Sequence, residues 1–175
     1  MILIERAWAM PNKWTFTILP IKNLLEEELK IYDMKETDIV IDPFAGMNSP
    51  ANLTNDLNPE MDAACHMDAL NFLKHMNSNC ASCILFDPPY SPRQIAESYK
   101  SVGLDTNGGE KTRSSFYSHI KNEIARIVKP GGKVISFGWN TNGIGKTRGF
   151  ELKRILIVAH GGAHNDTLVT VEIKR

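Results

Sequence analysis

The chain has 175 residues, 42% of them hydrophobic and 23% charged, a composition typical of one globular domain with a substantial core. Twenty Lys and Arg balance twenty Asp and Glu, and this net charge of zero argues against binding of nucleic acid by bulk electrostatics alone, while it leaves a local basic patch open. The amino terminus has no basic segment before a long apolar run, and no run approaches the ~20 residues of a membrane span, so we expect a cytoplasmic protein without membrane contact.

The first predicted element is a helix over 20–33. Pro20 suits the first turn of a helix, and apolar residues then recur at helical spacing along one side. These residues are Ile21, Leu24, Leu25, Leu29 and Tyr32.

Three short apolar runs follow: DIVID at 38–42, SCILF at 82–86 and KVISF at 133–137. Continuous apolar runs of about five residues are typical of strands in a parallel sheet that is buried on both faces. The segment between the last two runs predicts a helix that ends at the Pro-Gly-Gly of 130–132. Its apolar side consists of Phe116, Ile120, Ile124 and Ile127. Strand, helix, strand is the parallel crossover unit, so the fold class is α/β.

The chain ends in two β-rich runs, FELKRILIVAH and DTLVTVEIKR, separated by GGAHN. This pattern predicts an antiparallel hairpin, which makes the sheet mixed but mostly parallel. We expect the first of these strands to run parallel to the others, so that the turn at 160–166 lies on the same rim as Asp87. His160 and His164 would then contact a phosphate or a base, although structural histidines are an equally open interpretation.

The segment 91–113 is polar, carries Gly108 and Gly109, and predicts a long loop of the kind that often forms a lid. Ligands of an open α/β sheet bind beyond the carboxyl ends of its strands. Three such ends should lie side by side in this chain: 42–46, 87–90 and 138–140.

The cysteines raise the question of zinc, because Cys80 and Cys83 form a C-x-x-C pair. A four-ligand site would need a second closely spaced pair, and Cys83 lies in an apolar strand where a buried thiol behaves as a small hydrophobe. We therefore assign no metal.

Four motifs in order, DPFAG, NDLNP, MDAL and DPPY, resemble those of the S-adenosylmethionine-dependent methyltransferases that modify the exocyclic amine of adenine in DNA. The likeness is strongest to a compact phage and prophage group. It implies a class I, Rossmann-like methyltransferase fold over a single domain, 1–175, with no separate target-recognition domain. It also implies S-adenosylmethionine as the cofactor and DNA as the partner, with RNA as an alternative.

The resemblance also implies which residues hold the cofactor. Asp42, Phe44 and Gly46 would border its methionine end, and Asp56 would accept both ribose hydroxyls. Asp68, with the Ala69 amide beside it, would accept from the adenine amine, although Asp68 could instead cap the helix that follows.

The DPPY motif carries the chemistry in this interpretation. An exocyclic amine is a poor nucleophile because its lone pair is delocalised into the ring. The Asp87 carboxylate and the Pro88 carbonyl could accept its hydrogens, held rigid by the rings of Pro88 and Pro89. Tyr90 gives a face on which an extruded base can lie.

Target recognition must come from short segments. The candidates are Ser91 and Arg93 in 91–113, Trp139 and Asn140 in 139–149, and the amino-terminal AWAMPNKWTF. Its aromatic residues could form a platform, although core packing is the commoner role. Four cations could touch phosphates or form a solvated face: Lys146, Arg148, Lys153 and Arg154.

The chain departs from the family between Gly46 and Asp56, where only MNSPANLTN is present. So few residues cannot hold a helix and return along the sheet, so we expect a crossover without a helix. One sheet face would then be uncovered and would need a homodimer, a protein partner or the amino-terminal segment to bury it.

Other functions remain open at this point. One is a methyltransferase of guanine amines in ribosomal RNA, which uses a similar tetrapeptide. Another is a cofactor-binding subunit that recognises nucleic acid only with a partner. A protein glutamine methyltransferase is disfavoured because that group favours Asn at the first position of the motif.

Overall fold

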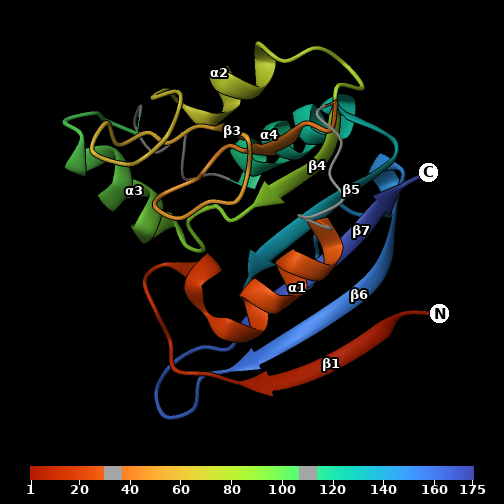
Figure 1. Cartoon of the computed structure of the whole chain (residues 1–175). Helices are drawn as coiled ribbons and strands as arrows, with labels where there is room; N and C mark the ends of the chain where they lie inside the picture. Colours follow the sequence, from red (N-terminus) through yellow and green to blue (C-terminus); the bar gives the residue numbers. More distant parts are fainter. Residues whose placement is uncertain (30–36, 107–113) are drawn as a thin grey trace.

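A computed structural model describes residues 1–29, 37–106 and 114–175 of the chain. These residues form a seven-stranded sheet with helices on both faces, in the strand order β1-β6-β7-β5-β4-β2-β3 (Figure 1). Within the described ranges, no helix is both long and apolar enough to cross a lipid bilayer.

The strands include the three predicted apolar runs and the terminal hairpin. They are β1 (Leu3–Trp8), β2 (Val40–Asp42), β3 (Leu53–Thr54), β4 (Ala81–Phe86), β5 (Val128–Gly138), β6 (Phe150–Ala159) and β7 (Thr167–Lys174). All neighbouring strands are parallel except β7, which runs antiparallel to both β5 and β6. The predicted mixed sheet is confirmed. Because β6 runs in the same direction as β4 and β5, its carboxyl end lies on the rim that holds Asp87, as expected.

The helices lie on the two faces of this sheet. They are α1 (Leu19–Leu29), α2 (Ala69–Lys74), α3 (Pro92–Ser101) and α4 (Ser114–Ile127), with short 3-10 turns η1 (Thr15–Thr17) and η3 (Lys146–Arg148). Helix α1 covers one face, and α2 and α4 cover the other (Figure 1). The end of the predicted first helix, 30–33, lies outside the described residues.

Helix α1 replaces the helix that is missing from the β2–β3 crossover. Residues 43–52 hold no helix, as predicted. Ile21 and Leu24 of α1 pack instead on the sheet, in one cluster with Cys83 and with Ala51 of the crossover. The buried-thiol interpretation of Cys83 is confirmed, and burial raises its pKa to about 12. Since the amino-terminal segment buries this face, the expectation of a homodimer over it loses its basis.

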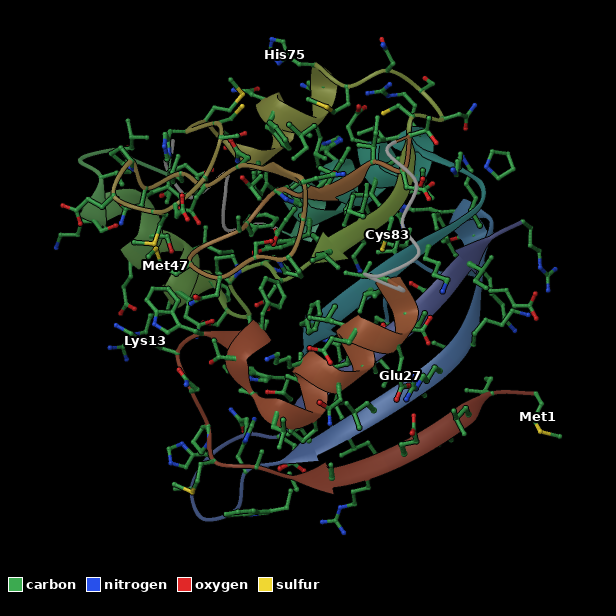
Figure 2. All side chains as sticks on the ribbon, viewed as in Figure 1. Met1, Lys13, Glu27, Met47, His75 and Cys83 are labelled. Atoms are coloured by element: carbon green, nitrogen blue, oxygen red, sulfur yellow. The ribbon has the colours of Figure 1, made fainter. Side chains whose placement is uncertain are left out.

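The edge strand β1 has no counterpart among the predicted elements, because Glu5 and Arg6 interrupt its apolar pattern. It pairs with β6 in parallel. Arg154 of β6 forms ion pairs with Glu5 at 2.5 Å and with Glu27 and Glu28 of α1 at 2.8 and 3.2 Å. This network lies on the α1 face of the sheet, where Figure 2 labels Glu27, so the phosphate contact considered for Arg154 is not supported.

Helix α3 corrects the prediction that 91–113 is a loop throughout. The Ser91 hydroxyl accepts from the Gln94 amide at 3.2 Å and caps the helix, and Pro92 occupies its first turn. Ile95 and Tyr99, one turn apart, are buried on its inner side. Residues 107–113, which include Gly108 and Gly109, lie outside the described residues.

Candidate functional site

The carboxyl ends of the parallel strands meet on one rim, and two cavities open there on either side of the Asp87–Tyr90 turn. The first cavity, of about 650 Å³, lies between the turn after β2, the start of α2, helix α3 and the amino-terminal segment 12–16. The second cavity, of about 510 Å³, lies between the same turn, helix α4 and the segment that follows β5. Pro88, Pro89 and Tyr90 line both cavities and separate them.

Asp87 follows the buried end of β4 and lines the first cavity. Burial raises the pKa of its carboxyl group, against the lowering effect of hydrogen bonds from Tyr90 and Thr15. The Tyr90 hydroxyl donates to Asp87 Oδ1 at 2.5 Å. The sequence pattern does not predict the Thr15 contact, because Thr15 lies far away along the chain, in the turn before α1. The result is a desolvated carboxylate held by two hydroxyl donors at the wall of a cavity.

The rest of the turn is fixed by its neighbours. The Tyr90 amide donates to Gln94 Oε1 at 2.7 Å, and the Tyr117 hydroxyl donates to the Pro89 carbonyl at 2.8 Å. The Tyr90 ring meets Trp139 edge to face with 5.5 Å between ring centroids. The DPPY segment is therefore rigid in both backbone and aromatic ring.

Asp42 has a different environment and corrects one prediction. It is fully buried and does not line the first cavity. Its Oδ2 accepts from the Ser49 hydroxyl at 2.6 Å, and its Oδ1 accepts from the Phe44 amide at 3.0 Å. Burial raises its pKa to about 7. Asp42 thus holds the turn whose other predicted members, Phe44 and Gly46, form the cavity wall.

Asp56 lines the first cavity and also connects two backbone segments of its wall by hydrogen bonds. Its two oxygens accept from the amides of Gly46 and Asn58, both at 2.8 Å. A carboxylate has about four acceptor positions, so two remain for a ligand. Gly46 has φ +53°, and a side chain there would meet the Trp14 ring at 3.6 Å. That distance is an ordinary van der Waals contact, so the left-handed backbone conformation, and not the ring, explains the glycine.

The three amino-terminal aromatics lie in different places, and Trp8 of β1, 65% exposed, lies neither in the core nor at these two cavities. Trp14 lines the first cavity, with the Lys13 amino group 4.7 Å from its ring centroid. Phe16 is buried in the core against Phe137. Figure 2 shows Lys13 on the same side of the molecule as Met47, which lines the cavity from the turn after β2.

Asp68 caps the helix that follows it and also lines the first cavity, where its contact with the cofactor stays a prediction. Its Oδ1 accepts from the Asn71 amide at 3.1 Å, which caps α2. The same residue lines the first cavity, together with Ala69. The Tyr99 hydroxyl of α3 donates to its Oδ2. Tyr99 is a site residue that the sequence pattern did not reveal, since α3 itself was not predicted.

The residues assigned to substrate binding separate into those at the cavities and those away from them. Ser91, Trp139 and Asn140 line the second cavity. Arg93 lines neither cavity; it is exposed and pairs with Glu97 at 2.7 Å, so the structure does not support its assignment.

The two histidines also differ from each other. The His160 ring is buried, with Nδ1 2.8 Å from the Ala9 carbonyl and Nε2 2.8 Å from the Thr167 hydroxyl. Both ring nitrogens are used within the protein, so His160 is a structural histidine. His164 is exposed in the turn and lines a third, smaller cavity near Trp139.

Comparison with known proteins identifies the fold. No family model and no curated protein matches the sequence. The structure of TrmN from Thermus thermophilus matches with a TM-score of 0.52 and 16% identity, over 90% of this chain and 49% of TrmN. The chain thus spans about half the length of that protein.

Two further solved structures match over more of their length. One is the Burkholderia thailandensis 1,6-didemethyltoxoflavin-N1-methyltransferase with bound S-adenosylhomocysteine, with a TM-score of 0.57, 12% identity, and coverage of 89% of this chain and 76% of that one. The other is the putative methyltransferase YhhF from Escherichia coli, with a TM-score of 0.55, 11% identity, and coverage of 94% and 91%. At these identities the likeness concerns the fold, which is the class I methyltransferase fold expected from the motifs.

Proposed function

We propose that the chain binds S-adenosylmethionine in the first cavity and transfers its methyl group to the exocyclic amine of adenine in DNA. The observation that carries the proposal is the position of Asp87. Its partly buried carboxylate lies in the wall of the first cavity, and the turn that holds it also lines the second. The fold shared with a methyltransferase that binds S-adenosylhomocysteine supports the cofactor, and the DPPY motif supports the amine.

The first cavity fits the proposed cofactor. Its volume of about 650 Å³ lies within the ~300–1,000 Å³ typical of ligand pockets. Asp56 offers carboxylate acceptors for ribose hydroxyls, and Asp68 offers them for an adenine amine. Gly46 allows close approach of a ligand to the backbone, and the Trp14 ring forms an apolar wall.

When bound, S-adenosylmethionine supplies the electrophilic methyl group. The Asp87 carboxylate accepts a hydrogen bond from the amine, which draws electron density toward the nitrogen and directs its lone pair. The Pro88 carbonyl forms no hydrogen bond to any described residue and can accept the second amine hydrogen. Because burial raises the pKa of Asp87, its carboxylate is also suited to take the proton that the amine loses.

Tyr90 and Trp139 would hold the base. Their edge-to-face contact leaves a rigid aromatic corner beside Pro88, at the wall between the two cavities. A base inside a duplex cannot reach a buried carboxylate, so the substrate must be a single strand or an extruded base.

A labelling experiment with Asp87→Ala tests the proposal. Protein and S-adenosylmethionine carrying a labelled methyl group are incubated separately with DNA, RNA and protein pools. We expect label in adenine of DNA, and a loss of ~10²–10³ in rate for Asp87→Ala because a preorganised electrostatic partner is removed. Calorimetry should show unchanged S-adenosylhomocysteine affinity in the variant.

The other outcomes decide between the alternatives. Label in guanine of RNA would indicate the ribosomal RNA function, and cofactor binding without transfer to any pool would indicate a recognition subunit. Full transfer by Asp87→Ala would mean that DPPY is only a turn in this chain.

A further inference from the structure

The second cavity contains two cations that the proposed chemistry does not use. Lys121 of α4 and Arg148 of η3 are both partly buried and line it. They lie close enough for the charge of Arg148 to lower the pKa of Lys121, beyond the larger lowering by burial. Two neighbouring cations in a concave, partly desolvated site favour an anionic ligand.

The hydrogen-bond partners of Arg148 leave its charge uncompensated. Its Nε donates to Asn122 Oδ1 at 2.7 Å, and its two terminal nitrogens donate to the Ser118 hydroxyl at 2.9 Å and the Ile144 carbonyl at 3.3 Å. All three acceptors are neutral. An arginine has five N–H donors, so this guanidinium is held in place with two donors unused among the described residues.

Lys121 has no hydrogen-bond or ion-pair partner within 1–29, 37–106 and 114–175. The carboxylate that acts on it is Glu172 of β7, which raises its pKa and so opposes the other two effects. Each oxygen of Glu172 accepts from a backbone amide, one from Ile144 at 2.6 Å and the other from Gly145 at 3.0 Å. Glu172 therefore holds the loop above the cavity rather than pairing with Lys121.

A buried hydroxyl lines the same cavity without a partner. Ser136, near the end of β5, is 7% exposed, and its Oγ forms no hydrogen bond to the described part of the chain. Thr170, directly opposite in the β5–β7 register, has an unpaired hydroxyl too. The Ser136 Oγ atom has less than 1 Å² of accessible surface, so the protein covers it and the anionic preference of the cavity comes from the two cations.

We propose that the second cavity is a phosphate subsite, in which Lys121 and Arg148 bind a backbone phosphate of the strand that carries the target base. This inference rests on the proposed function, since the base would lie against Tyr90, on the wall that the two cavities share. It adds a substrate class, a phosphodiester-linked nucleotide, and a reason for a chain of zero net charge to bind nucleic acid. Local cations in a pocket supply the attraction that a net charge of zero does not.

The test measures binding without turnover. A fluorescent 12-nucleotide single-stranded DNA containing adenine is titrated onto protein saturated with S-adenosylhomocysteine, over a series of salt concentrations. Lys121→Gln should weaken binding at least tenfold and lower the slope of log affinity against log salt by about 0.7, the value for one lost phosphate contact on a single strand. Lys121→Arg should restore both quantities, and the exposed Lys74→Gln in α2 should change neither.

Parallel titrations with AMP and adenosine show whether the bound phosphate belongs to a strand or to a free nucleotide. If the protein prefers AMP to adenosine, loses this preference in Lys121→Gln and does not bind the oligonucleotide, the subsite binds a free nucleotide phosphate.

The phosphate subsite would be overturned if Lys121→Gln left the oligonucleotide affinity, the salt slope and the AMP binding all unchanged. This result is distinguishable from failure of the proposed function, because methyl transfer to DNA by the same protein would still be observed. Absence of any oligonucleotide or AMP binding by the unmodified protein would overturn the subsite as well.

Discussion

The chain contains the dipeptide Asp-Pro at the ends of two neighbouring parallel strands, with opposite consequences. Asp42-Pro43 ends β2, and Asp87-Pro88 ends β4. Both aspartates are desolvated, and burial raises the pKa of both. Asp42, however, is sealed behind the turn that follows it, whereas Asp87 forms part of a cavity wall.

The difference comes from the donors that the next residues supply. The turn after Asp42 folds back, so a backbone amide and the Ser49 hydroxyl both point at the carboxylate. The prolines after Asp87 have no N–H to donate, and the chain continues outward into α3. The donors of Asp87 are side-chain hydroxyls, from Tyr90 and Thr15. Hydroxyls on side chains can be replaced by a substrate amine more easily than a backbone amide can.

The largest expected effect concerns how the free energy of unfolding depends on pH through Asp42. The folded protein keeps the Asp42 proton up to about pH 7, whereas the unfolded chain loses it near its ordinary value of 3.8. Stability therefore falls as pH rises from about 4 to 7, by roughly 4 kcal/mol from this group. Asp42→Asn removes the titration and can keep both hydrogen bonds. Urea unfolding from pH 4 to pH 8 should show a flatter profile for the variant; equal profiles would mean that Asp42 ionises normally.

A smaller effect is expected at Asp56, which lines the first cavity as Asp87 does and holds a turn as Asp42 does. Asp56→Ala should weaken S-adenosylhomocysteine at least tenfold, because hydrogen bonds to a charged group contribute about 1.5–3 kcal/mol each. It should also lower the thermal midpoint, since the Gly46 and Asn58 amides lose their acceptor. Calorimetry and thermal unfolding measure the two effects. Unchanged cofactor affinity with a lowered midpoint would make Asp56 structural, like Asp42.

The smallest effect is expected for Tyr90→Phe, which keeps the ring but removes the hydroxyl. The Tyr90 hydrogen bond lowers the pKa of Asp87, so its loss should raise that pKa further. Asp87 must be ionised to accept from the amine, and the acid limb of the methyl-transfer rate should therefore move to higher pH. A pH–rate profile from pH 5 to 9 checks the direction. An acid limb that stays in place would show that the Tyr90 hydroxyl does not control Asp87.

The sequence allowed the sheet and the rim that holds the candidate site to be predicted, because continuous apolar runs and helical spacing dominate those parts. It did not reveal β1, whose Glu5 and Arg6 obscure the strand pattern but are accommodated at the edge. It did not reveal α3, because Ile95 and Tyr99 are the buried residues of an otherwise polar helix.

The roles of individual acids were harder to predict than their positions. Asp42 and Asp87 occupy equivalent positions in the pattern, and what separates them is tertiary. Ser49 folds back onto the first, and Thr15 contacts the second from η1, in the amino-terminal part of the chain. In the sequence, Lys121 resembles any exposed lysine of an amphipathic helix. Only the fold places it in one cavity with Arg148, next to the loop that Glu172 holds.

The same substitution at both strand ends tests the central claim most directly. Asp87→Asn and Asp42→Asn are compared in one methyl-transfer assay on DNA, with S-adenosylhomocysteine affinity measured for each. Asp87→Asn should reduce the rate at least ~10-fold at unchanged affinity, because a neutral amide is a weaker acceptor than a carboxylate. Asp42→Asn should transfer methyl groups within about twofold of the unmodified protein. Equal losses in both variants, or full activity in Asp87→Asn, would contradict the assignment of Asp87 as the residue that acts on the amine.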